Sequence, residues 1–158
     1  MSRLFLFTDG SVHVQSKIGF GAFLLIAEEE LLNENLKAGV NTKRFENTSS
    51  TKLELQTLIW ALAELELGDH GIIIFTDSQN ITQLLERRKG LEESHFRTKK
   101  GELLNNYELY KEFYQMIDLL NCEIVKVRGH QPTRNKNEIE RVFALVDKAS
   151  RKALRNGI

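Results

Sequence analysis

The sequence has little of what marks a secreted, membrane-bound or strongly charged protein. Cys122 is the only cysteine among 158 residues, so no internal disulfide can form, which is typical of a reducing compartment. No apolar run approaches the ~20 residues of a membrane span, and a strand pattern begins at once, without a leader pattern. These absences predict a cytoplasmic protein that is bound to no membrane.

The chain also has no net charge. The 22 basic and 22 acidic side chains cancel, so any surface that binds nucleic acid must be local. Hydrophobic residues make up 41% of the chain, the usual fraction for a globular protein, and no repeat or low-complexity linker is present. The length suits one domain with a sizeable core. We therefore expect a single domain over residues 1–158, a monomer without an obligate protein partner.

Hydrophobic periodicity predicts the elements. Residues 3–8 and 71–76 are continuous apolar runs, typical of parallel strands covered by helices. A second strand from residue 17, a turn near 28–30 and a third strand around 35–45 lie too close together for helical crossovers, so these strands should be antiparallel. Helical spacing is found in 49–68, 78–88, 103–120 and 140–155, and 122–129 is a fifth strand. The segments 87–101 and 129–138 have loop character.

Two of the apolar strands are followed by an aspartate, in FTDGS and FTDSQ. Asp9 has an ordinary explanation, because Asp-Gly is the strongest hairpin-turn dipeptide. Asp77 has one too, because an Asp or Ser after a strand commonly caps the next helix. If the first and fourth strands are parallel neighbours, however, both aspartates leave the sheet side by side at its carboxyl edge, where open α/β sheets bind ligands.

Two further carboxylates lie in predicted helices. Glu54 completes a capping-box pattern with Thr51, which would stabilise the start of its helix. Asp147 lies among apolar residues inside the last helix, where an unpaired buried charge is costly, although a solvated helix face would also explain it. Clustered carboxylates repel one another, so a shared site requires cations, and oxygen ligands select Mg²⁺ or Mn²⁺.

In order along the chain, the segments FTDGS, TKLEL, FTDSQ, RGH and LVDKASRKAL resemble type 1 ribonuclease H over nearly the whole sequence. The resemblance implies an α/β fold of the ribonuclease H-like type, with the order β-β-β-α-β-α-α-β-α. Its five-stranded mixed sheet has strands 1–3 antiparallel and strands 4 and 5 parallel to strand 1, flanked by helices. It places the four metal-binding carboxylates on Asp9, Glu54, Asp77 and Asp147, and a mobile catalytic histidine on His130.

The resemblance also implies an activity. The expected enzyme is an endonuclease that hydrolyses the RNA strand of RNA–DNA hybrids, with two Mg²⁺ ions during catalysis or Mn²⁺ in their place, and leaves 5′-phosphate and 3′-hydroxyl ends. Positions that would contact phosphate or sugar are Ser11, Ser49, Ser50 and Gln79. A basic segment that would grip the hybrid comprises Arg87, Arg88, Lys89, Arg97, Lys99 and Lys100.

Several alternatives stay open at this point. The glycine-rich loop that usually follows the first DGS of the family is replaced by VHVQSKIGFG, which puts the affinity for a hybrid in question. His130 would also fit an exposed loop, and the basic segment a solvated one. The chain as a whole would also fit an inactive nucleic-acid-binding domain of the same fold. A phosphatase is disfavoured because neither FTD motif has an Asp-x-Asp pair, and a transposase because the chain is too short for end-binding domains.

Overall fold

A computed structural model describes residues 3–66, 68, 70–128 and 137–158. Its strands are β1 (Leu4–His13), β2 (Ile18–Ala27), β3 (Asn41–Phe45), β4 (Ile72–Thr76) and β5 (Cys122–Lys126). Its helices are α1 (Ser50–Ala63), α2 (Gln79–Glu93), α3 (Tyr107–Leu119) and α4 (Glu138–Gly157), with 3₁₀ turns η1 (Glu28–Glu30) and η2 (Leu36–Gly39). His130 lies outside the described residues.

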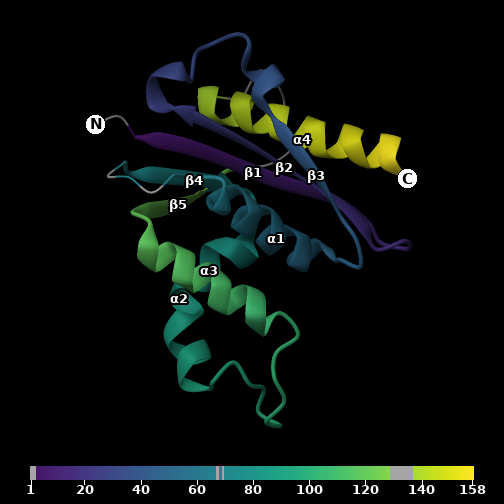
Figure 1. The fold of residues 1–158 in the computed structure, drawn as a ribbon, viewed down its shortest axis with the longest axis vertical. Helices are drawn as coiled ribbons and strands as arrows, with labels where there is room; N and C mark the ends of the chain where they lie inside the picture. The colour runs from purple at the N-terminus through teal and green to yellow at the C-terminus, as the bar shows by residue number, and fades with distance from the viewer. Residues whose placement is uncertain (1–2, 67, 69, 129–136) are drawn as a thin grey trace.

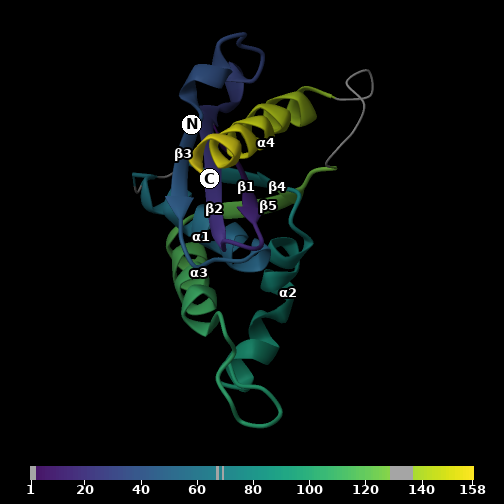
Figure 2. The same ribbon diagram turned by 90° about the vertical axis from the view of Figure 1, so that its right-hand side faces the viewer.

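The five strands form one mixed sheet in the order β3-β2-β1-β4-β5. The pairs β1–β2 and β2–β3 are antiparallel, whereas β1–β4 and β4–β5 are parallel. This arrangement confirms the predicted ribonuclease H-like topology. Helix α4 lies along one face of the sheet and α1 along the other, while α2 and α3 extend away from the sheet on the α1 side (Figures 1 and 2).

The sheet separates two hydrophobic clusters. On the α1 side, Leu6 and Ile74 pack with α1 and α3, and on the α4 side Phe7 and Phe75 pack with Phe143 and its neighbours. The alternation follows from the two-residue period of a strand, which sends successive side chains to opposite faces. By the same period, Asp9 shares the face of Phe7, which is the α4 face.

Strand β1 does not turn at Asp9-Gly10. It continues to His13, and Asp9 pairs with Ala22 of β2 in the antiparallel ladder. The parallel pairing with β4 ends earlier, at Phe7 and Phe75. The hairpin-turn explanation of Asp9 is therefore wrong. Asp9 lies inside a strand, at the point where β1 runs on past its parallel neighbour and that side of β1 is left open.

Other boundaries also differ from the sequence-based prediction. The third strand begins only at Asn41, because residues 36–39 form the turn η2. Helix α1 ends at Ala63, before Gly68. Helix α2 continues through Gly90 to Glu93, so Arg87, Arg88 and Lys89 are helical and the connecting loop begins later than expected. Only local polarity favoured a loop there, and packing against α3 extends the helix.

Two glycines in the first hairpin let α1 lie close to the sheet. A Cβ atom on Gly21 would be 2.2 Å from Oγ1 of Thr57, and one on Gly10 would be 2.9 Å from Cδ2 of Leu53. Either side chain would push α1 outward. The close approach positions Glu54, which lies between Leu53 and Thr57 in sequence, near the open side of β1.

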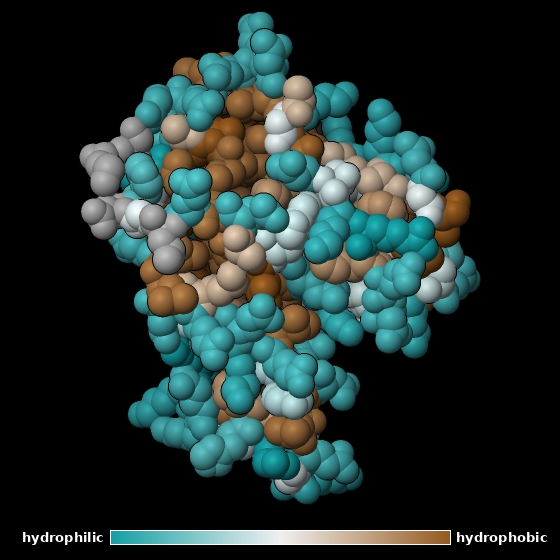
Figure 3. All heavy atoms as spheres, in the orientation of Figure 1, coloured by the Kyte–Doolittle hydropathy of each residue, from teal (hydrophilic) through white to brown (hydrophobic). Residues whose placement is uncertain are grey.

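The described surface is polar where helices extend from the sheet. On the face in Figure 3, hydrophilic side chains cover most of the lower part of the molecule, and an apolar area lies in a hollow of the upper part. Within the described ranges, none of the helices has the length and apolar character needed to cross a bilayer.

Candidate active site

Acidic side chains from β1, α1, α4 and the connection after β4 approach the place where β1 extends past β4. A small pocket there is lined by Asp9 of β1, Glu54 of α1 and Asp77, which follows β4. Thr8 and Thr76 from the two parallel strands complete much of its wall. The prediction that both FTD motifs deliver an aspartate to one edge of the sheet thus agrees with the geometry.

Glu54 is held by the residue that follows the second aspartate. The hydroxyl of Ser78 donates a hydrogen bond of 2.6 Å to Oε2 of Glu54. Burial raises the pKa of Glu54, the hydrogen bond from Ser78 lowers it, and the nearby charge of Asp77 raises it again. Ser78 is itself buried and also caps α2 by accepting a hydrogen bond from the amide of Ile81. The carboxylate of Glu54 is therefore oriented by a fixed donor.

Asp147 reaches the site from the opposite face of the sheet. Its carboxyl group lies close enough to that of Asp9 to raise the pKa of Asp9. Its Oδ2 also accepts a hydrogen bond of 2.8 Å from Nη2 of Arg151, one helical turn later. Helix α4 is anchored beside β1 by Ser150, whose hydroxyl lies 2.9 Å from that of Ser11. The explanation of Asp147 as a solvated surface residue does not fit these contacts.

Asp9 is the most perturbed group of this cluster. Burial, the charge of Asp77 and the interaction with Asp147 together raise the pKa of Asp9 to about 9, while a backbone hydrogen bond from Gly10 opposes them. Burial is the largest cause, and the contributions of Asp77 and Asp147 indicate that negative charge is also in excess at the site. A cation placed among these oxygens would remove that excess.

The donor set fits a hard divalent ion, but the side chains do not already enclose one. All four groups offer carboxylate oxygens, the ligands of Mg²⁺ and Mn²⁺. Among the residues that the structure describes, no three His, Cys, Asp or Glu side chains converge closely enough to hold a metal ion. Asp9 and Asp147 lie on the α4 side of the sheet, and Glu54 lies on the α1 side. Glu54 accepts a hydrogen bond from Ser78, and Asp147 is paired with Arg151. Metal binding would require these side chains to turn toward one another.

Capping does not explain the acidic residues. The N-cap of α1 is Ser49, which accepts a hydrogen bond from the amide of Lys52, so the proposed capping box of Thr51 and Glu54 is wrong. The N-cap of α2 is Ser78 rather than Asp77. Serines therefore cap both helices, and capping accounts for neither Asp77 nor Glu54.

The predicted phosphate- and sugar-contacting residues lie around the same edge. Ser49 and Ser50 are exposed at the start of α1, about one turn before Glu54, and Gln79 is the exposed first residue of α2. Ser11 lies on β1 two residues after Asp9 and bonds to Ser150. Their contact with a substrate stays a prediction.

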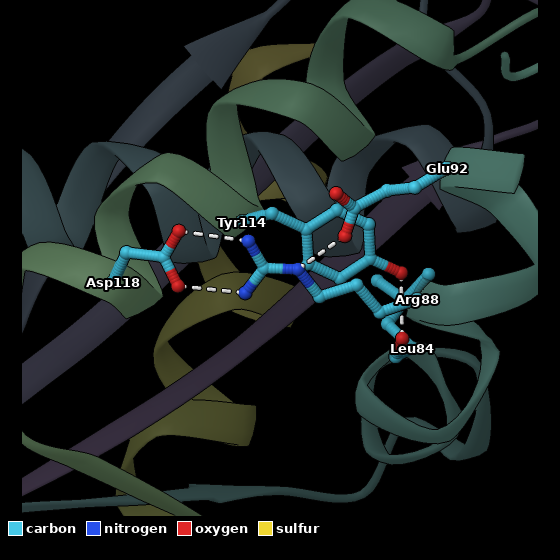
Figure 4. Close-up of polar contacts among 5 residues, drawn as sticks. All are labelled: Leu84, Arg88, Glu92, Tyr114 and Asp118. Atoms are coloured by element: carbon cyan, nitrogen blue, oxygen red, sulfur yellow. Dashed lines mark hydrogen bonds and ion pairs between the residues drawn. The ribbon is translucent and has the colours of Figure 1, made fainter.

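The basic segment divides into one engaged arginine and several exposed cations. Arg88 donates two hydrogen bonds of 2.7 Å to Asp118 of α3 and one of 2.6 Å to Glu92 (Figure 4). Its guanidinium also lies over the ring of Tyr114, 5.0 Å from the centroid. These contacts join α2 to α3, so Arg88 is better placed to hold the two helices together than to bind a phosphate.

The other cations of this segment are exposed. Arg87 and Lys89 lie on α2, and Arg97, Lys99 and Lys100 lie in the loop that joins α2 to α3. Arg97 donates to the carbonyl of Gly101 across a turn. The segment projects from the sheet at the far end of α2 and α3 (Figures 1 and 2).

Sequence reasoning missed two residues that shape the site, Ser78 and Arg151. Each had a local signal. Ser78 directly follows an apolar strand and precedes a helix, the usual place of an N-cap. Arg151 follows Asp147 by four residues within a helix, the spacing of an ion pair. Neither signal reveals the second contact that brings the residue into the site.

Several solved structures share this fold. The solution structure of the PFV RNase H domain has 17% sequence identity and a TM-score of 0.72, and the match covers 96% of this chain and 94% of that chain. The native protease–reverse transcriptase of prototype foamy virus has 16% identity and a TM-score of 0.75, over 96% of this chain and 21% of that one.

A further match is a foamy viral protease–reverse transcriptase in complex with an RNA/DNA hybrid, with 15% identity and a TM-score of 0.71. It covers 96% of this chain and 20% of that chain, so the present chain spans about a fifth of these larger proteins. No curated protein sequence matches this chain. At such identities the likeness is one of fold. The family is shown separately by a match between residues 1–153 and the family model for RNase H. The chain therefore belongs to the RNase H family.

Proposed function

We propose that this protein is a metal-dependent endonuclease that hydrolyses the RNA strand of RNA–DNA hybrids, and that residues 1–158 form a single catalytic domain. The observation that supports it most is the gathering of Asp9, Glu54, Asp77 and Asp147 from four separate parts of the chain at one edge of the sheet. Membership of the RNase H family supports the substrate class. The products would carry 5′-phosphate and 3′-hydroxyl ends.

In this proposal all four carboxylates are metal ligands, and Asp9 has the central part. Asp9, whose pKa responds to both Asp77 and Asp147, would be the ligand shared by two Mg²⁺ ions, with Mn²⁺ able to replace them. When bound, such ions supply an attacking hydroxide and stabilise the leaving 3′ oxygen. Ser78 would keep the carboxylate of Glu54 oriented, and Arg151 would release Asp147. Ser49, Ser50 and Gln79 would contact phosphate or the 2′-hydroxyl group that distinguishes RNA.

Hydrolysis of an end-labelled hybrid tests this function. Cleavage of the RNA strand is expected with Mg²⁺ and not with a chelator, and RNA–RNA and DNA–DNA duplexes of the same sequence serve as controls. A protein that binds the hybrid without cutting it in Mg²⁺ or Mn²⁺ would instead be a nucleic-acid-binding domain. That second function is favoured by one observation, that the described carboxylates do not enclose a metal ion as they lie.

We further propose that His130 assists turnover. A histidine with a pKa near neutrality can move protons or help a product to leave. His130→Ala is expected to slow hydrolysis without abolishing it, and to change the dependence of kcat on pH. The measurement is kcat from pH 6 to 9 in wild type and variant. An unchanged kcat over this range would assign His130 to a solvated loop.

The exposed cations of the basic segment should govern binding rather than chemistry. Replacement of both Arg87 and Lys89 with Gln is expected to raise KM and to leave kcat at saturation nearly unchanged, the pattern of lost uniform binding. The slope of log affinity against log salt should become shallower by about 0.9 per lost phosphate contact. Superimposable salt plots would show that the hybrid is held elsewhere.

Arg88→Gln is the contrasting variant in the same helix. Loss of its contacts with Asp118, Glu92 and Tyr114 should lower the free energy of unfolding by ~1 kcal/mol, the scale of a well-formed but partly exposed ion pair. The salt slope for the hybrid should stay close to that of the wild type. A slope that changed as much as in the Arg87 and Lys89 variant would return Arg88 to the binding surface.

A further inference from the structure

A groove lined by cations lies beside the candidate active site, between α4 and the turn η2, and shares Arg151 with that site. Its volume is about 370 Å³. Two apolar side chains, Leu145 and Ala149, line it, and every other lining residue is basic. The basic residues are Lys37, Lys148, Arg151, Lys152 and Arg155. We call this set the α4 groove. No carboxylate is among its lining residues, in a chain whose total charge is zero.

Four of the five cations of the α4 groove make no ion pair within the described part of the molecule. Arg151 pairs with Asp147. Over the described part of the chain, Lys37, Lys148, Lys152 and Arg155 make no ion pair, and all four are exposed. Their side chains are therefore available to an external anion.

Stabilisation of the carboxyl end of α4 does not account for the basic residues of the α4 groove. Cations favour the carboxyl end of a helix, but the effect falls off within the last turn. Helix α4 ends at Gly157, so Arg155 is in that turn, whereas Lys148 lies more than two turns before it. The spacing 148, 152 and 155 instead puts three cations along one stripe of the helix.

We propose that the α4 groove binds the phosphodiester backbone of a nucleic acid, as a second contact surface beside the active site. Lys148 and Arg155 are seven residues apart, about 10 Å along the helix axis. One strand of a duplex carries a phosphate for every ~3.4 Å of duplex axis, so a row of cations of this length can face several phosphates of one backbone. The inference rests on the proposed function, because that function supplies the nucleic acid.

The shape of the surface favours nucleic acid over a membrane. A helix that lies on a bilayer inserts an exposed apolar face between the lipid head groups. The apolar face of α4 is not exposed: Val142, Phe143 and Val146 are buried against the sheet. At the groove, α4 instead presents a row of cations along a concave surface, which is suited to a narrow chain of phosphates.

The test is the affinity for an RNA–DNA hybrid, measured at several salt concentrations in a chelating buffer, which keeps the hybrid uncut. The main variant replaces Lys148, Lys152 and Arg155 with Gln. Its salt slope should be shallower than that of the wild type by about 1 per contacting cation, hence by up to about 3. Lys152→Gln alone should show a smaller change of the same sign. Lys111→Gln, an exposed cation on α3, is the matched control and should leave the slope unchanged.

The outcomes separate this inference from the proposed function. A wild type that does not cut a hybrid in Mg²⁺ or Mn²⁺ overturns the function, whatever the salt slopes are. Wild type and triple variant with superimposable salt plots overturn the α4 groove, even when cleavage is intact. A variant that loses binding to phosphatidylserine vesicles but keeps its hybrid affinity would also overturn it, in favour of a lipid surface.

Discussion

Asp9→Asn is expected to abolish hydrolysis of a hybrid while the fold is kept. The proposed shared ligand loses its charge, and metal ions of this kind provide several kcal/mol of transition-state stabilisation. Since every ~1.4 kcal/mol changes a rate tenfold, kcat should fall at least ~100-fold. The melting temperature without metal should be equal to that of the wild type or higher, because folding of the wild type at neutral pH requires Asp9 to take up a proton that the unfolded chain has released, and asparagine has no such cost.

Asp118→Asn is the matched control, since Asp118 is an aspartate on α3 outside the site. It should show the opposite pattern: a lower melting temperature, from the lost bidentate contact with Arg88, and unchanged cleavage. Asp77→Asn and Glu54→Gln should follow Asp9→Asn in activity. Turnover by purified Asp9→Asn close to that of the wild type would contradict its assignment as a metal ligand.

The second large effect concerns pH and metal together. The pKa of Asp9 in the folded protein, about 9, lies above its value in an unfolded chain, so the folded state binds the extra proton. Its contribution to stability is complete below about pH 4 and is lost as the pH rises toward 9. In chelating buffer, the stability of the wild type relative to Asp9→Asn should therefore fall between pH 5 and 8, by at most ~1.4 kcal/mol per pH unit.

Divalent metal should remove this loss. An ion that binds only the folded state adds RT ln(1 + [L]/Kd) to its stability, and it also favours ionised Asp9. Mg²⁺ or Mn²⁺ should raise the melting temperature of the wild type at pH 8, with a much smaller effect on Asp9→Asn. Denaturant unfolding at each pH, with and without metal, measures both differences. Parallel pH profiles of the two proteins in chelator would contradict the buried, charge-crowded environment of Asp9.

The sequence alone determined the element order and the pairing of the first four strands, and the resemblance to ribonuclease H supplied the place of the fifth. Continuous apolar runs are read directly as strands buried on both faces, and short spacing between the first three strands excludes helical crossovers. The helix before β4 makes a crossover connection, which predicts that β1 and β4 are parallel. The meeting of Asp9 and Asp77 at one edge was therefore predictable from the two FTD motifs. These features depend on local periodicity and connection length, which a sequence displays.

Only the tertiary structure decided which carboxylates have a local explanation. The turn at Asp9-Gly10 and the capping box at Glu54 were sound local patterns, but the antiparallel ladder with β2 continues through Asp9, and Ser49 caps α1. Likewise, the sequence predicted Arg88 as part of a basic segment that grips the hybrid, with a solvated loop as the alternative, whereas α3 provides Asp118 and Tyr114 as its partners. Local propensities differ by about 1 kcal/mol or less, so contacts between distant segments override them.

The positions of Glu54 and Asp147 at the site also depended on packing between segments that are distant in the sequence. Glu54 arrives because Gly10 and Gly21 leave room for α1 against the first hairpin, and Asp147 because Ser150 and Ser11 join α4 to β1. A sequence shows that a glycine or a serine is present but not what approaches it. The distance between an acidic group on one helix and a strand many residues away is decided by side-chain volume at such contacts, and close packing makes that distance specific.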